Sequence, residues 1–173
     1  MFADGEFHHK GKIFMEIRQG YSYHIKDEFF ELVQDEYLMS NKEQGNYRPH
    51  YYAILDKKNP ELYWTIPISS QAEKYKGIIE KKKKRYGKCN TIVIGLFAGK
   101  ENAFLIQNTF PIIEKYFDHV HTIQEQPVKI HKKLDKLLVE NLNEVLAMNN
   151  RGIKLTFTDI KAIRKIMEKQ LEK

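Results

Sequence analysis

Residues 63–75 constrain the fold of this chain more than any other stretch, because the side-chain pattern changes there from strand to helix within a few positions. Residues 63–68 are mostly aromatic or β-branched, which is typical of a strand. Ser69 and Ser70 follow, and residues 71–85 then carry Tyr75 and two isoleucines on one helical face. We therefore predict a strand that turns directly into a helix, with two serines at the corner.

The other apolar segments predict hairpins and helices without a regular β-α-β rhythm. Residues 51–55 and 62–68 flank an Asn-Pro turn and predict a hairpin, while residues 91–98 predict a central strand paired with residues 103–107. A short edge strand is expected at 119–123. Helices are expected at 26–39, 71–85, 111–117 and 127–148, and a last one capped by Thr156 or Thr158.

This mixture is typical of the α+β class, with a twisted, mainly antiparallel sheet flanked by helices. A length of 173 residues fits one compact domain, so we expect residues 1–173 to form a single domain.

The charge balance favours a polyanionic partner. The chain has 29 Lys and Arg residues against 23 Asp and Glu, a net charge of +6. The single Cys89 excludes an internal disulfide, and residues 1–10 do not resemble a secretory signal, so we expect a cytoplasmic protein. The longest apolar run, residues 91–98, is far shorter than the roughly 20 residues of a membrane helix, and no membrane association is expected.

The serine corner, defined here as Ser69, Ser70 and the first turn of the following helix, is the strongest candidate for chemistry. Ser70 and Glu73 have the spacing of a capping box, which accounts for Ser70 without any ligand. Ser69 has no such structural role in the pattern, and Lys74 is expected one turn beyond Ser70 on the same side of the helix. Hydroxyls, a helix N-terminus and an ammonium group together are able to stabilise a charged phosphate.

Two further groups of polar residues bear on that hypothesis. Tyr47, Arg48 and His50 enter the hairpin at the end where the serines are expected, and His50 is either an acid–base group or a polar residue at a strand start. The basic residues of the helix either form a solvated face that complements the helix dipole or bind RNA phosphates. They are Lys81, Lys82, Lys84 and Arg85, together with Lys88 just after the helix.

His119 and His121 are expected on one face of a strand, a spacing that suits a metal ion. No Cys or carboxylate cluster completes a ligand set nearby, so an exposed or structural pair is the simpler interpretation. A metal-dependent nuclease that uses both histidines stays open as a weaker hypothesis.

Four short motifs occur together, in an order and spacing similar to those of one known family, over about residues 20–150. The motifs are Tyr23-His24-Ile25-Lys26-Asp27, Arg48-Pro49-His50-Tyr51, Trp64-Thr65-Ile66-Pro67-Ile68-Ser69-Ser70 and Asn108-Thr109-Phe110-Pro111-Ile112. On these motifs the chain resembles the ToxN/AbiQ family, the toxins of type III toxin–antitoxin systems, and is most similar to the CptN branch.

The resemblance implies a compact fold similar to that of the Kid/MazF toxins and a metal-independent endoribonuclease that needs no cofactor. Cleavage of cellular or phage RNA would leave 2′,3′-cyclic phosphate and 5′-hydroxyl ends. The implied partner is a small repeat-derived RNA antitoxin with a pseudoknot fold. The toxin processes this RNA and is inhibited by it, and the two together form a closed oligomer.

The resemblance also implies roles for single residues. Ser69 and Ser70 take the place of the family's catalytic (Thr/Ser)-Ser pair, His50 falls near a lysine at the strand entry, and Tyr47 falls near an upstream tyrosine. Arg48 and Tyr51 belong to the same strand entry and are expected to contact RNA. Family members often carry a lysine where this chain has Ala72, so either Lys74 replaces it or His50 takes more of the proton transfer.

A hypothesis from another class stays open beside this one. A non-catalytic RNA- or DNA-binding module would need only the basic helix and the aromatic residues. It predicts binding without cleavage.

Overall fold

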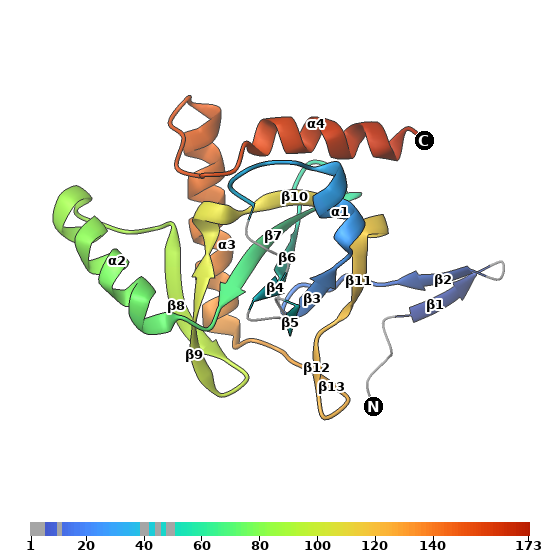
Figure 1. Cartoon of the computed structure of the whole chain (residues 1–173), viewed down its shortest axis with the longest axis horizontal. Coiled ribbons are helices and arrows are strands. Elements are labelled where there is room, and N and C mark those ends of the chain that lie inside the picture. The colour runs from blue at the N-terminus through green and yellow to red at the C-terminus, as the bar shows by residue number, and fades with distance from the viewer. Residues whose placement is uncertain (1–5, 10–11, 39–41, 44–45, 48–50) are drawn as a thin grey trace.

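The computed structural model describes residues 6–9, 12–38, 42–43, 46–47 and 51–173 of the chain (Figure 1). Within these residues the largest sheet has seven strands in the order β11-β3-β6-β7-β9-β8, with β10 beside β7. All of its pairings are antiparallel. Its strands are β3 (Ser22–Ile25), β6 (Tyr51–Leu55), β7 (Leu62–Ser69), β8 (Ile92–Phe97), β9 (Lys100–Leu105), β10 (Phe110–Ile113) and β11 (Phe117–Val120).

Helices and short hairpins complete the described part of the chain. The α-helices are α1 (Asp27–Leu32), α2 (Ala72–Tyr86), α3 (Lys132–Asn150) and α4 (Ile160–Leu171), with two 3-10 turns, η1 (Ile106–Asn108) and η2 (Glu114–Tyr116). The hairpins pair β1 (Glu6–His9) with β2 (Lys12–Met15), β4 (Lys42–Glu43) with β5 (Asn46–Tyr47), and β12 (Thr122–Ile123) with β13 (Gln126–Pro127). The predicted α+β class with a mainly antiparallel sheet is confirmed.

Strand β7 joins the two parts of the sheet. One of its edges pairs with β6, from Tyr51↔Pro67 to Leu55↔Tyr63, which confirms the predicted hairpin. Along its other edge, β10 pairs with the first half of β7, and β9 pairs with Ile68 and Ser69 at its end. The end of β7 that carries Ser69 and leads to Ser70 is therefore fixed by a ladder to β9.

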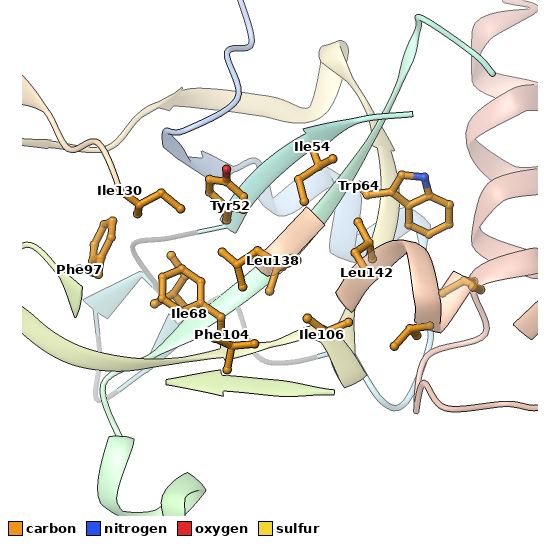
Figure 2. Packing of buried hydrophobic residues seen from close by; sticks show 14 residues of the cluster. Tyr52, Ile54, Trp64, Ile68, Phe97, Phe104, Ile106, Ile130, Leu138 and Leu142 are labelled. Atoms are coloured by element: carbon orange, nitrogen blue, oxygen red, sulfur yellow. The ribbon is translucent and has the colours of Figure 1, made fainter. Parts of the chain in front are cut away.

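Alternation of side chains along the strands separates the core into two layers. Tyr23, Ile25 and Ala53 pack on one face, against α1 and α4. Tyr52, Ile54 and Phe104 pack on the other face, against α3 (Figure 2). The remaining helix, α2, covers β8 and β9 through Tyr75, which contacts Ile92, Ala103 and Leu105.

The strand predicted at residues 91–98 forms, but its predicted central place in the sheet is wrong. β8 pairs only with β9 among the described strands and so lies at an edge. Its apolar character has another cause: Ile92 faces α2 and Val93 faces the α3 layer, so both faces of this edge strand are covered. Burial on two sides produces the same sequence pattern as a central position.

The helix predicted at residues 111–117 is wrong. Pro111 lies in β10, where Pro111 faces Trp64 of β7, and only the 3-10 turn η2 follows. Because β10 pairs only with β7 among the described strands, a proline without an N–H is tolerated on it. The buried run Phe110–Ile113 satisfies the strand pattern as well as the helical one.

Three predicted helix boundaries differ from the observed ones. The helix expected at 26–39 ends at Leu32, and the one expected from Pro127 begins at Lys132, because Pro127 pairs within β13. Neither Thr156 nor Thr158 caps the last helix. Both are buried and bond to backbone oxygens, and Asp159 caps α4 instead by accepting a bond from the Ala162 amide at 3.1 Å.

None of the helices within the described residues is both long enough and apolar enough to cross a membrane.

Candidate functional site

The serine corner forms where the sequence places it, but its two serines have different environments. Ser69 is the last residue of β7 and is buried, and its Oγ accepts a hydrogen bond from the Gln71 amide at 3.2 Å. Ser70 is exposed between β7 and α2. Ser69 therefore shapes the turn, whereas Ser70 presents its hydroxyl at the surface.

The predicted capping box is wrong. Helix α2 begins at Ala72, so the N-cap position belongs to Gln71, which makes no side-chain cap bond. Glu73 is one position too early to reach back, and it pairs with Lys76 at 2.9 Å instead. The Ser69 hydroxyl satisfies the Gln71 amide, so the turn is stabilised by the serine before the expected one.

Lys74 is exposed in the first turn of α2, with Nζ 5.4 Å from the centre of the Tyr75 ring. Ser70 precedes the helix, so the four-residue spacing no longer places the two side chains on one helical face. Lys76 is the cation engaged in this region: its ammonium donates to Glu73 at 2.9 Å and to Glu101 at 3.1 Å.

The basic residues of α2 and the segment after it divide into two sets. Lys81, Lys84 and Arg85 are exposed. Lys82 Nζ donates to Thr91 Oγ1 and to Gln107 Oε1, both at 2.9 Å, and so ties α2 to the sheet. Lys88 pairs with Glu144 of α3. The exposed set is open to a polyanion, while Lys82 and Lys88 have internal partners.

The strand-entry residues are described only in part. Arg48 and His50 lie outside the described residues. Tyr47 belongs to β5, and Tyr51 begins β6, where its backbone lies between Tyr23 of β3 and Pro67 of β7.

Three histidines converge on the α3 side of the sheet, one from β3 and two from β11 and the residue that follows it. His24 of β3 lies directly opposite His119 of β11, and the amide of His121 donates to the Ser22 carbonyl at 2.8 Å. The His24 and His119 rings are stacked, with centres 4.2 Å apart and planes inclined by 14°. His24 Nε2 lies 3.0 Å from His121 Nδ1.

The ring series continues to a residue of another strand. The centres of His24 and His121 are 5.2 Å apart, and His121 lies 6.0 Å from Phe97 at the end of β8. Phe97, His121, His24 and His119 thus form a series of neighbouring rings, named here the histidine column. Its outer end is His119, whose side chain is 60% exposed.

Burial sets the protonation of the inner rings. Burial first, and then the charges on His119 and His121, lower the pKa of His24 from about 6.5 to about 4. Burial and the neighbouring His119 also lower the pKa of His121. Both rings are therefore neutral near pH 7. In the part of the chain that the structure describes, no three His, Cys, Asp or Glu side chains are arranged to hold a metal ion.

The sequence singled out His119 and His121 but not His24 or Phe97. Alternation in residues 22–25 would have placed His24 on the face opposite Tyr23 and Ile25. The pairing of β3 with β11 joins residues almost a hundred positions apart, and no local pattern reveals it.

Neither the family models nor the curated proteins include a match to this sequence. Among solved structures, the chain is similar to AbiQ, a lactococcal anti-phage endoribonuclease belonging to the type III toxin–antitoxin system. The TM-score is 0.62 at 11% identity, and the match covers 88% of this chain and 98% of the AbiQ chain. The two proteins share a fold over nearly their whole lengths.

Proposed function

We propose that this protein is a metal-independent endoribonuclease toxin of a type III toxin–antitoxin system, of the ToxN/AbiQ family and its CptN branch, acting as a single cytoplasmic domain. One observation carries the proposal. An exposed serine stands between β7 and α2 in a chain that shares its fold with the endoribonuclease AbiQ over 88% of its length.

In the proposed reaction, the 2′-hydroxyl of the substrate RNA attacks the adjacent phosphorus. A base removes the 2′-proton, and the 5′-oxygen leaves with a proton from an acid, which gives a 2′,3′-cyclic phosphate and a 5′-hydroxyl. His50 and Lys74 are the proposed proton-transfer groups, and Tyr47 is proposed as a further catalytic residue. Ser70 and the amides at the start of α2 stabilise the extra negative charge on the phosphate.

Contacts to the rest of the RNA are proposed for the entry residues Arg48 and Tyr51 and for the exposed cations Lys81, Lys84 and Arg85. Lys82 and Lys88 contribute mainly by holding the helix and the following segment in place, because their ammonium groups bind Gln107 and Glu144. The proposed inhibitor is a small repeat-derived RNA that the toxin itself processes and with which it assembles into a closed oligomer.

The test is cleavage of single-stranded RNA by purified protein in EDTA, followed by analysis of the product ends. We expect cyclic phosphate ends, no cleavage where the ribose that supplies the attacking 2′-hydroxyl is replaced by 2′-deoxyribose, and a loss of about 100-fold in rate in Ser70→Ala. The matched control is Thr122→Ala, which removes an exposed hydroxyl on β12 and leaves the rate unchanged.

Three outcomes would contradict the proposal. Binding of RNA without cleavage would favour the non-catalytic module, and activity that disappears in EDTA would exclude the metal-independent mechanism. A Ser70→Ala protein as active as Thr122→Ala would remove the serine corner from the site.

A further inference from the structure

The histidine column lies at the same end of the sheet as the serine corner. Tyr23 of β3, Tyr51 of β6 and Pro67 of β7 are paired in one row, and β3 runs parallel to β7 because each is antiparallel to β6. His24 therefore lies in the same row of the sheet as Ile68, two strands away, which corresponds to a backbone separation of roughly 10 Å. A single-stranded RNA of a few nucleotides that reaches Ser70 can also reach His24 and its neighbours.

The column is a series of neighbouring rings, stacked only between His24 and His119, that is buried at one end and exposed at the other. Its inner end is Phe97, which is buried, and its middle rings, His121 and His24, are partly buried. Its outer ring, His119, is stacked on His24 through one face at 4.2 Å. The exposed remainder of His119 is where the series can be extended by one more flat ring.

Charge on the column also favours a flat, uncharged partner over a phosphate. His24 and His121 have lowered pKa values because of burial, so both rings are neutral near pH 7. A carboxylate stands at the outer end: Asp118 Oδ2 lies 3.2 Å from His119 Nδ1 and disfavours an anion there. Unpaired bases of single-stranded RNA commonly stack on aromatic side chains, histidine included.

We propose that the histidine column is a base-stacking subsite, at which an unpaired RNA base near the cleaved bond stacks on the exposed ring of His119. This inference rests on the proposed function, because it takes single-stranded RNA to be the ligand. The remaining rings act as positioning residues: His24 holds the His119 ring by stacking, His121 contacts His24, and Phe97 contacts His121.

The test separates binding from cleavage by using a short single strand of mixed sequence with 2′-O-methyl riboses, which cannot be cut by internal attack. Its affinity is measured by fluorescence anisotropy, together with strands that carry one abasic position each. We expect His119→Ala to bind the full strand about 5- to 100-fold more weakly than wild type. One abasic position should weaken wild-type binding similarly and leave His119→Ala binding unchanged.

Two variants serve as matched controls for the loss of the ring. His119→Phe keeps a flat ring without the imidazole nitrogens, and we expect it to bind within about threefold of wild type. Phe157→Ala removes an aromatic ring that is also exposed but lies in the segment before α4, and it should bind as wild type does.

Equal affinities of His119→Ala and wild type for the full strand would overturn the subsite. The same conclusion would follow if an abasic position weakened binding equally in both proteins, or if the wild type did not bind the strand. Failure of the proposed function is a separate result. In that case the wild-type protein does not cleave unmodified RNA but still binds the methylated strand in a way that depends on His119.

Discussion

The serine corner and the histidine column lie at the same end of one sheet but are assembled in different ways. The corner consists of consecutive residues, and the bond from the Gln71 amide to Ser69 Oγ spans two positions. The column takes rings from β3, from β8 and from β11 with the residue after it, and its closest nitrogen pair joins His24 to His121, 97 positions apart. One is a local structure, and the other exists only after the sheet has formed.

The two sites also differ in how much their side chains contribute to the stability of the fold. At the corner, Ser70 projects from a turn that Ser69 already holds, so the surface hydroxyl is dispensable for the fold. In the column, Phe97 belongs to the core and the partly buried rings of His121 and His24 follow it, whereas the outer ring of His119 is largely exposed. Substitutions should therefore affect folding strongly in the interior of the column and weakly at the corner.

The largest expected effect on stability is that of His24→Ala. It removes a ring stacked on His119 and a partner of His121, and we expect the free energy of unfolding to fall by about 2–3 kcal/mol. Urea denaturation measures it. The matched variant His119→Ala, on the exposed side of the same stack, should cost less than about 1 kcal/mol. Equal losses of stability in the two variants would mean that the inner ring of His24 contributes no more to the fold than the exposed ring of His119.

The pH dependence of stability gives the next effect. The pKa of His24 is about 4 when folded against about 6.5 in the unfolded chain, so between these values the unfolded chain binds a proton that the folded protein does not. The free energy of unfolding should therefore fall as pH drops from about 6.5 to about 4 and be unaffected by this group at higher pH. The lowered pKa of His121 acts in the same direction.

For a half-buried ring beside His119, His121 and Asp118, solvent screening limits this contribution to about 1–2 kcal/mol. Denaturation midpoints measured from pH 4 to pH 8 check it, and His24→Gln should show the shallower profile. The control is His131→Asn, which replaces an exposed histidine and keeps an acceptor at the N-cap of α3. A His24→Gln profile identical to that of wild type would contradict the prediction.

The two serines provide a smaller contrast. Ser69→Ala removes the acceptor of the Gln71 amide, and we expect a loss of about 1 kcal/mol in the free energy of unfolding. Ser70→Ala should change it by less than about 0.5 kcal/mol, because the hydroxyl is exposed. Thermal denaturation of both variants tests this. A stability loss in Ser70→Ala that exceeds the loss in Ser69→Ala would reverse the structural assignment of the corner.

The smallest effects are expected on the basic helix that leaves the corner. Lys84→Gln removes an exposed cation, so RNA binding should weaken a few-fold, with a salt dependence shallower by about one charge. Lys82→Gln breaks the bonds to Thr91 and Gln107, so its main effect should be on stability. Binding measured across a series of salt concentrations, with melting temperatures for both proteins, distinguishes the two roles.

Prediction from the sequence succeeded where the information is local. The hairpin of β6 and β7, the strand-turn-helix corner and most of α2 follow from residue patterns that span one or two elements. It failed at Pro111 and at residues 91–98, because an apolar run fits several structures until its neighbours are known. It also assigned the cap to the wrong residue, since a shift of one position at a helix start exchanges Ser70 for Gln71 as the N-cap.

By itself, the sequence determined the α+β class, the place of the serine corner and an excess of positive charge, because periodicity, turn residues and composition do not depend on distant contacts. The tertiary structure alone decided that Ser69 is buried while Ser70 is exposed, and that Lys82 faces the sheet. It also decided that His24 meets His119 and His121. The pairing of β3 with β11 closes a loop of almost a hundred residues, and only the packing of the complete sheet specifies it.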